Sequence, residues 1–454
     1  MHTPSRTRNI VLAMVASILL LPISSLAAGA KNVVLMIGDG MGPSHFGAAW
    51  LYSNRVLGKE LRMVEVMMRG RTAYLVNDTA DAIITDSAAA ATQIACGVKV
   101  PARVVGMGTD GKTPCKTVLE LAKEKGLATG LVTTSGITDA TPAAFAAHVE
   151  HRSDEASVAA QELRTGVDVL LGGRRQFFLP VAAGGQRKDG RDLVEEARRA
   201  GYAVVGTASQ LQQVGRGKIL GLFNMGNMAF EMDRAKTAEP SLAEMTAKTL
   251  EVLAKNSKGF FVMVEGGRID HAAHRNDAAA TIRDTLAFDD AVGVVVEFQR
   301  QNPDTLIIVT ADHETGGMAL IGDSKNSVGI DLSAVQKAQS SFELIAEELG
   351  KDPAPERIRD AVKKHTGIEI TDDEAKIVAN DTIRKLDPYN FPNATLHTLA
   401  FVLRPYLPVG WVSQTHTASL LLAFGSGPGS EDLVGFCHNT ELFRIMRTAL
   451  EVGH

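Results

Sequence analysis

The sequence contains little cysteine. Only three of its 454 residues are cysteines, namely Cys96, Cys115 and Cys437, and no Cys-x-x-Cys spacing occurs. The scarcity of thiols argues against cysteine as a metal ligand in this chain. In an exported protein the three residues allow one disulfide and one leftover thiol, and the sequence leaves the pairing open.

The chain also lacks an excess of positive charge. Its formal net charge is −5 and its isoelectric point is near 6.2, so no electrostatic footprint for nucleic acid is visible over the whole chain. Hydrophobic residues make up 45% and charged residues 22%, which is ordinary for a globular protein. The length is sufficient for a large core and by itself suggests two or three domains.

Long apolar runs are absent apart from one at the N-terminus. Arg6 and Arg8 precede the apolar stretch Ile10–Leu21, and small residues follow it. This order predicts a secretory signal peptide over residues 1–30 and an exported chain, periplasmic or secreted, of residues 31–454. The alternative is a membrane anchor, but the run is shorter than the ~20 apolar residues that a spanning helix needs. No second stretch is long enough to cross a membrane after cleavage.

Beyond the leader, strand-like apolar runs alternate with helical patterns. Candidate strands are Asn32–Ile37, Ala128–Thr134, Val167–Leu171, Ile219–Phe223, Phe260–Glu265, Thr305–Thr310 and Ser419–Phe424. Candidate helices are Thr117–Lys125, Pro142–His151, Leu242–Lys255 and Asp277–Gln299. Near-continuous Val, Ile, Leu and Phe runs are typical of parallel strands buried on both faces. The sequence therefore predicts an α/β protein with a large central, mostly parallel β-sheet flanked by helices on both faces.

One segment departs from this alternation. Residues 325–400 are rich in Lys, Glu, Asp and Ala, with helical spacing in Phe342–Leu349 and Arg357–Lys364. A helix start is also visible at Thr371. Because the segment lies between two strand-like regions, we expect a mostly helical insertion within the main domain.

A serine stands where a helix is expected to begin. The residues Thr85, Asp86 and Ser87 end a strand-like run and precede four alanines. Thr and Asp are favoured N-cap residues and Ala is the best helix former, so Ser87 falls in the first helical turn. The unpaired N–H groups and the helix dipole at that position favour negative charge. Seen alone, the segment is more simply a helix cap than a site for a nucleophile.

Polar side chains follow several of the predicted strands directly. They are Asp39, Thr141, Glu265, Asp270, Asp312, His313 and, just before the last strand, His416. In an open α/β sheet, ligands bind beyond the carboxyl ends of the strands. Each of these residues has a structural alternative: Asp39 lies in a glycine-rich turn, and a single histidine is more often structural than a ligand. Several such groups, each just past a buried strand, favour a metal site.

The spacing of the polar residues indicates which metals. Asp270 and His274 are four residues apart, so on a helical turn they share a face and can bind one ion. Asp312 and His313 are adjacent and offer two kinds of ligand. Mixed His and Asp ligands without Cys suit catalytic zinc, whereas a carboxylate such as Glu265 suits magnesium.

An arginine closes the predicted helix Pro142–His151. Arg152 at that place is explained equally well by a favourable interaction with the helix dipole or by a bidentate clamp on phosphate oxygens. Its position along the sequence does not decide between the two.

Taken together, these stretches resemble the metal-dependent alkaline phosphatases. The matching stretches are Met36–Pro43, Thr85–Lys99, Thr133–Arg152, Val264–His274, Thr310–Gly317 and Gln414–Ala418. They occur in the family's order and are specific only in combination. The resemblance implies a catalytic domain over residues 31–454 that hydrolyses small phosphate monoesters through a phosphoserine, and a homodimer. The segment 325–400 lies outside the matched motifs.

The resemblance also implies a role for each site residue. Ser87 would be the phosphorylated nucleophile, Arg152 would bind the phosphate and Asp86 would hold that arginine. The implied ligands are Asp270, His274 and His416 for one Zn²⁺; Asp39, Asp312 and His313 for a second Zn²⁺; and Asp39, Thr141 and Glu265 for one Mg²⁺, with Asp139 reaching it through water.

Two residues near the implied Mg²⁺ site do not both match the same branch of the family. His271 stands where the enterobacterial enzyme has Lys and the animal members have His, whereas Asp139 stands where the animal members have His. This mixture leaves the metal preference of the third site open. The alternatives to a phosphomonoesterase are a phosphodiesterase of the same superfamily and a non-catalytic exported protein that binds phosphate or metal.

Overall fold

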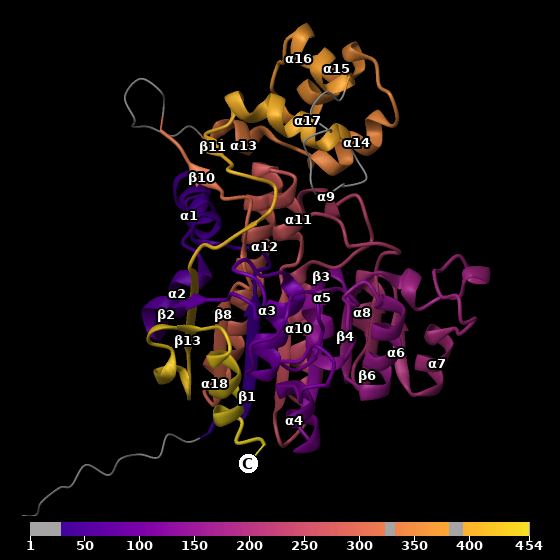
Figure 1. Cartoon of the computed structure of the whole chain (residues 1–454), viewed down its shortest axis with the longest axis vertical. Helices are drawn as coiled ribbons and strands as arrows, with labels where there is room; N and C mark the ends of the chain where they lie inside the picture. The colour runs from indigo at the N-terminus through magenta and orange to yellow at the C-terminus, as the bar shows by residue number, and fades with distance from the viewer. Residues whose placement is uncertain (1–28, 323–331, 381–393, 454) are drawn as a thin grey trace, which may run out of the picture.

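A ten-stranded sheet forms the centre of the molecule. The computed structural model describes residues 29–322, 332–380 and 394–453, and the strand order in this part of the chain is β14-β2-β13-β8-β1-β7-β3-β4-β6-β5 (Figure 1). The strands are β1 (Asn32–Ile37), β2 (Arg71–Val76), β3 (Ala128–Gly136), β4 (Val169–Gly173), β5 (Tyr202–Val205), β6 (Lys218–Leu222), β7 (Phe260–Glu265), β8 (Thr305–Thr310), β13 (Leu421–Ser426) and β14 (Gly435–His438). Only β13 runs antiparallel to its neighbours, so the predicted mostly parallel sheet is confirmed.

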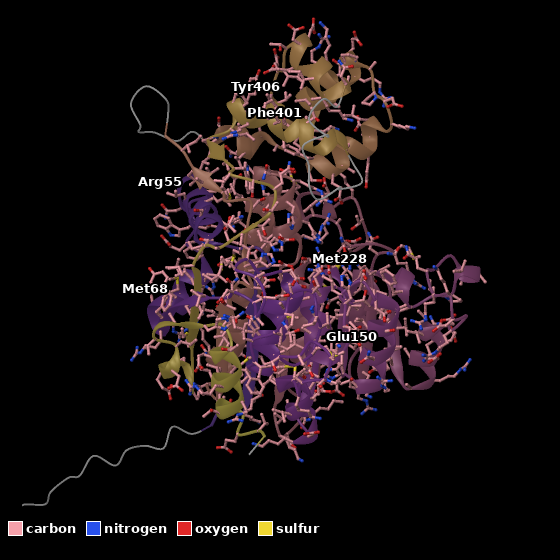
Figure 2. All side chains as sticks on the ribbon, viewed as in Figure 1. Arg55, Met68, Glu150, Met228, Phe401 and Tyr406 are labelled. Atoms are coloured by element: carbon pink, nitrogen blue, oxygen red, sulfur yellow. A yellow bond between two sulfur atoms is a disulfide. The ribbon has the colours of Figure 1, made fainter. Side chains whose placement is uncertain are left out.

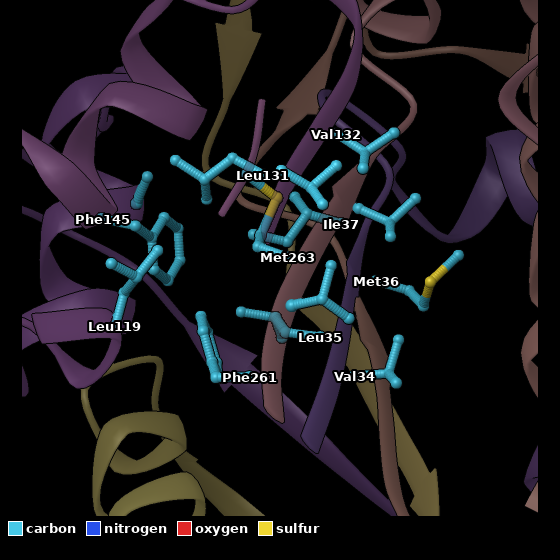
Figure 3. Packing of buried hydrophobic residues seen from close by; sticks show 14 of the residues in the cluster. Val34, Leu35, Met36, Ile37, Leu119, Leu131, Val132, Phe145, Phe261 and Met263 are labelled. Atoms are coloured by element: carbon cyan, nitrogen blue, oxygen red, sulfur yellow. The ribbon is translucent and has the colours of Figure 1, made fainter. Parts of the chain in front are cut away.

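Helices cover both faces of the sheet. Phe261 of β7 stacks on Phe145, whereas the preceding Phe260 packs against Phe298. Successive residues of a strand point to opposite faces, so the helices that carry Phe145 and Phe298 lie on opposite sides. Figure 3 shows the first of these layers, with Phe145 and Leu119 packed over the central strands. The prediction of helices on both faces is confirmed.

The helices outside the segment 325–400 differ widely in length. They are α1 (Pro43–Tyr52), α2 (Arg62–Arg69), α3 (Ser87–Cys96), α4 (Val118–Glu124), α5 (Ala140–Ala146), α6 (Glu155–Thr165), α7 (Leu193–Arg199), α8 (Ala208–Gln213), α9 (Glu231–Arg234), α10 (Leu242–Leu253), α11 (Arg268–His274), α12 (Ala278–Gln301) and α18 (Glu441–Ala449). Three of the four predicted helices correspond to α4, α10 and α12. The capping box of Thr117 and Glu120 explains why α4 begins where the sequence indicates.

The fourth predicted helix, Pro142–His151, is wrong in extent. Helix α5 already starts at Ala140, because the Asp139 side chain caps it, and it ends at Ala146. Ala147 has extended backbone angles, and Val149 then pairs with Val105 in an isolated antiparallel bridge. Arg152 consequently lies in a turn beyond the helix. Its alternative interpretation, an interaction with the dipole at the end of that helix, is therefore wrong, because α5 ends at Ala146.

The central register brings strand ends together. β1 lies between β7 and β8, and Ile37 at its end is level with Glu265 and Thr310. All six residues of each of these strands are buried. The residues that follow them must therefore emerge side by side at one edge of the sheet.

The described part of the segment 325–400 and its continuation contain five helices. They are α13 (Ser333–Lys337), α14 (Phe342–Leu349), α15 (Pro355–Thr366), α16 (Asp372–Asn380) and α17 (Ala394–Leu403). Ile345, Val362 and Leu399 belong to a hydrophobic cluster separate from the main core. Figure 2 places Phe401 and Tyr406 in this helical part, away from the sheet.

The helical segment is tied to the main domain by charge. Glu343 of α14 forms ion pairs with two arginines, the buried Arg268 at 2.7 Å and the partly buried Arg275 at 2.8 Å. Among the described residues no helix combines the length and the apolar character needed to cross a bilayer. The predicted signal peptide falls on residues 1–30, of which 1–28 lie outside the described part.

Candidate active site and metal centre

Helix α3 begins at Ser87, as the sequence predicts. Asp86 has extended backbone angles and is the N-cap, since its carboxylate accepts hydrogen bonds from the amides of Ala88 and Ala89. The Ser87 side chain is thus not used for capping. Its Oγ is buried and lies 3.0 Å from Nε2 of His313. The serine hydroxyl therefore faces one of the predicted metal ligands.

Asp270, His274 and His416 form the first of two groups that could hold a metal ion. Nε2 of His274 lies 3.2 Å from Oδ2 of Asp270 and 3.2 Å from Nε2 of His416. The other ring nitrogens face backbone carbonyls, Nδ1 of His274 at 2.6 Å from Gln414 O and Nδ1 of His416 at 2.9 Å from Thr85 O. Such backbone partners fix the rings and leave both Nε2 atoms directed at one point, as in metal sites.

The second group surrounds His313. Its Nε2 lies 3.4 Å from Oδ1 of Asp39 and 3.3 Å from Oδ2 of Asp312, so the three predicted ligands are brought together. Asp270 also belongs to this group, within reach of Asp39 and His313. The sequence does not indicate that Asp270 belongs to both groups. It follows from the close approach of α11 to the turn after β1, where a Cβ on Gly40 would lie 2.9 Å from Cα of Asp270.

A third set of oxygens lies around Glu265. Glu265, Thr141 and Asp39 each have one buried side-chain oxygen that forms no hydrogen bond within the described part of the chain. The other Glu265 oxygen accepts a hydrogen bond from Thr133. Buried oxygens without a partner are costly, and a hard cation with oxygen ligands would satisfy them. These residues therefore fit a magnesium ion.

Asp139, predicted to reach that ion through water, faces two arginines. Its Oδ1 accepts from Arg152 at 3.2 Å and its Oδ2 pairs with Arg174 at 2.9 Å. His271 is farther away, with Nε2 4.0 Å from Oδ2 of Asp139. Sequence reasoning missed Arg174, because nothing in the pattern that ends β4 marks it as a site residue.

Arg152 is held by two carboxylates. Its Nη1 donates to Oδ2 of Asp86 at 3.1 Å, and its Nη2 donates to Asp139. Burial alone lowers the pKa of Arg152, but the carboxylates of Asp139 and Asp86 outweigh it and the pKa lies above its usual value. The guanidinium is thus permanently charged and fixed in orientation, as an anion clamp requires.

The buried carboxylates of the site repel one another. Burial, reinforced by Asp312 and Asp270, raises the pKa of Asp39 well above its usual value. Burial also raises the pKa of Glu265 to about 8 and that of Asp312 to about 7. So many buried acids are compatible with an ionised state only beside cations, which agrees with metal binding.

The remaining predicted residue, His271, lies between the site and the helical segment. Its Nδ1 is 3.0 Å from Nη1 of Arg268, whose other nitrogen pairs with Glu343 of α14. Burial and the neighbouring Arg268 lower the pKa of His271 well below its usual value. The imidazole is therefore neutral and supports its neighbours by hydrogen bonding.

The fold and the site define a metal-dependent hydrolase of the α/β class, with a serine, an arginine and carboxylate–histidine groups at the carboxyl edge of a parallel sheet. The family model for alkaline phosphatase matches residues 30–452, so the chain belongs to the alkaline phosphatase family and is a phosphatase. Alkaline phosphatase 4 of Bacillus subtilis is 33% identical over 92% of this chain and 89% of its own length.

Two further relatives support the assignment. The alkaline phosphatase of Escherichia coli K12 is 35% identical over 65% of this chain and 72% of its own length. The crystal structure of alkaline phosphatase from Thermus thermophilus superimposes with a TM-score of 0.87 at 34% identity, covering 95% of this chain and 93% of that one. The similarity therefore extends over sequence and fold alike.

Proposed function

We propose that the chain hydrolyses phosphate monoesters to inorganic phosphate and an alcohol through a covalent phosphoserine at Ser87. The observation that carries this proposal is the Ser87 hydroxyl, which is buried, free of the capping role and 3.0 Å from Nε2 of His313. A serine that only capped α3 would direct its oxygen at the helix amides. Here Asp86 takes that role, which leaves the hydroxyl available as a nucleophile.

The proposed metal content is two Zn²⁺ and one Mg²⁺. The first zinc is assigned to Asp270, His274 and His416, the second to Asp39, Asp312 and His313, and the magnesium to Asp39, Thr141 and Glu265, with Asp139 near it. The group of Asp270, His274 and His416 supports the first zinc, the short distances from Nε2 of His313 to Asp39 and Asp312 support the second, and the buried oxygens of Glu265 and Thr141 support the magnesium. Bound zinc would supply a Lewis acid that lowers the pKa of the serine hydroxyl and stabilises the leaving oxygen.

In the first step Ser87 Oγ gives its proton to solvent and forms a bond to phosphorus. The ester P–O bond opposite breaks, and the leaving oxygen takes a proton from solvent to depart as the alcohol. In the second step the phosphoserine P–O bond is broken by water, which releases phosphate and restores the Ser87 hydroxyl. The positive end of the α3 dipole lies at Ser87, the first residue of that helix, and stabilises the negative oxygen in both steps.

Arg152 binds two oxygens of the phosphoryl group and stabilises the charge that develops on them. Its ion pairs with Asp86 and Asp139 fix the guanidinium before substrate arrives, so little conformational entropy is lost on binding. Asp86 therefore acts through Arg152, and Ser87 and Arg152 are the two side chains that contact the transferred group.

The wider organisation is proposed from the sequence. Residues 1–30 are a signal peptide, the mature chain 31–454 is one catalytic domain with a mostly helical insertion at 325–400, and the protein is exported to the periplasm or secreted. A homodimer is proposed by analogy with the family. The Arg6 and Arg8 region followed by a short apolar run supports export.

The activity is tested on purified protein with an aryl phosphate monoester and the matching diester at alkaline pH, with and without a chelator. We expect monoesterase activity that chelation removes and that Ser87→Ala lowers by several orders of magnitude. Ser241→Ala is the matched control, because Ser241 also stands at a helix start but caps α10 in a capping box with Glu244 and is none of the site residues. It is expected to retain activity. Turnover of the diester alone, or activity insensitive to chelation, would contradict the proposal.

The covalent step has a separate test. Brief incubation with substrate under mildly acidic conditions, followed by denaturation, should leave phosphate on Ser87, detected by mass spectrometry of the peptide. The Ser87→Ala variant should show none. An active enzyme with no modified peptide under these conditions would argue for direct attack by water.

A further inference from the structure

Arg174 occupies a backbone position suited to glycine. It follows β4 directly and has φ 59° and ψ 39°, in the left-handed region that residues with a Cβ seldom adopt. Its amide donates a hydrogen bond to Gly226 O, which holds the backbone there. The side chain then passes over Gly136, where a Cβ would lie 2.2 Å from Cδ of Arg174. An unfavourable conformation at the edge of the site indicates a local requirement for the side chain.

The guanidinium of Arg174 is fixed by three partners. Nη2 lies 2.9 Å from Oδ2 of Asp139, Nη1 lies 2.7 Å from Oε2 of Glu155, and Nε donates to Oδ1 of Asn227 at 2.9 Å. All three nitrogens are engaged, and the side chain is only 18% exposed. The positive charge is therefore held in one place and is little screened by solvent.

Both oxygens of Asp139 are engaged as a result. Oδ1 accepts from the amide of Ala140 at 2.8 Å and from Arg152, while Oδ2 faces Arg174. Two guanidinium groups offset the single negative charge of Asp139. The neighbouring oxygens of Glu265 and Thr141 have no partner in the described part of the chain. The Asp139 carboxylate is thus directed to the two arginines.

We propose that Arg174 is a positioning residue that sets the Mg²⁺ affinity of the third metal site. It holds the Asp139 carboxylate toward the arginines and places a fixed positive charge beside the site, so Mg²⁺ binds more weakly than it would to the same oxygens without Arg174. This inference rests on the magnesium assignment made under the proposed function. It concerns binding of the ion and needs no step of the reaction.

The test measures Mg²⁺ binding to the zinc-loaded protein by isothermal titration calorimetry, without substrate. Arg174→Gly removes the guanidinium, and the left-handed backbone suits glycine, so the fold is kept. Its Mg²⁺ Kd is expected to be at least fivefold lower than that of the parent. Arg174→Lys keeps the charge, and its Kd is expected within threefold of the parent. Arg175→Ala is the control, because it removes the positive charge of the next residue. The backbone amide of Arg175 donates a hydrogen bond to Asn224 O, and its guanidinium lies near Gly206.

The possible outcomes separate clearly. An unchanged or higher Mg²⁺ Kd in Arg174→Gly overturns the inference. So does a fall of the Kd in Arg175→Ala or in Arg174→Lys that equals the fall in Arg174→Gly. Absence of Mg²⁺ binding in both the parent and Arg174→Gly also overturns it. Repeating the titration with Ser87→Ala as the background keeps the two proposals apart. The magnesium effect should persist there, whereas loss of the phosphoserine would count only against the proposed reaction.

Discussion

Asp86 uses one carboxylate to begin helix α3 and to hold Arg152, whose Nη1 lies 3.1 Å from Oδ2 of Asp86. Oδ1 accepts from the amides of Ala89 and Arg103, and Oδ2 accepts from Arg152 and, more distantly, from Ala88. The cap and the anchor are thus divided between the two oxygens. This division allows the two functions to be separated by substitution.

Asp86→Asn should preserve the helix and weaken the hold on Arg152. Asn is as good an N-cap as Asp and keeps one carbonyl oxygen, whereas Ala provides none and costs about 1 kcal/mol of stability. We expect the Asn variant to unfold near the parent temperature and the Ala variant below it. Both should bind inorganic phosphate roughly tenfold more weakly, because a hydrogen bond between charged groups is lost. Thermal unfolding and phosphate inhibition constants check this. Parent-like phosphate affinity in both variants would show that Asp139 alone orients Arg152.

Asp270 is expected to matter more for metal content than any histidine of the site. It is the one residue that occurs in both of the groups found among the described residues that could hold a metal ion. Asp270→Asn should therefore lower the bound zinc by nearly two ions per chain, whereas His274→Ala should lower it by about one. Elemental analysis after dialysis measures the difference. Equal losses in the two variants would restrict Asp270 to a single ion, as the sequence alone suggests.

The central part of the fold was predictable from the sequence because its signal is local. β1, β7 and β8 are six-residue apolar runs buried on both faces, and their predicted bounds agree to the residue with the structure. β2, β5 and β14 were not predicted. In β2, Arg71 and Tyr74 are exposed, and in β14 Phe436 is 65% exposed, so the apolar pattern is broken at this margin of the sheet.

The site was predictable to the extent that it depends on strand ends. Parallel strands bring the residues after them to one edge, so Asp39 and His313 could be expected to meet. The end of α5 depends instead on the bridge between Val149 and Val105, which is a non-local contact and has no sequence signal. The same is true of Arg174, whose importance follows only from its left-handed backbone and its distance to Asp139.

The disulfide in the structure joins Cys96 and Cys115 and leaves Cys437 free. Alkylation of the denatured, unreduced protein should therefore label Cys437 alone, as read by peptide mass spectrometry. The bridge ties Cys96, the last residue of α3, to Cys115 with a sequence separation of 19, so the Cys96→Ser/Cys115→Ser variant should be less stable by about 3 kcal/mol. Cys437→Ser should unfold like the parent. Labelling of all three residues would contradict the pairing.

A buried acid away from the metal centre should make the protein less stable at alkaline pH. Glu162 of α6 is fully buried, and no described residue hydrogen-bonds either of its carboxylate oxygens. Burial, with a smaller contribution from Glu155, raises its pKa well above the usual value. The folded chain therefore keeps a proton that the unfolded chain loses above about pH 4.5. Stability must then fall as the pH rises from that value toward the folded-state pKa, because the unfolded state binds fewer protons.

Glu162→Gln removes this proton linkage while keeping the shape of the side chain. Thermal unfolding at pH 5, 7 and 9 should show the variant close to the parent at pH 5 and more stable than the parent, by a few degrees, at pH 9. Glu150→Gln is the matched control, because Glu150 is exposed and its substitution should give the same difference at every pH. A Glu162→Gln difference that does not grow with pH would mean that the carboxylate is already ionised in the folded chain, stabilised by water that enters beside α6.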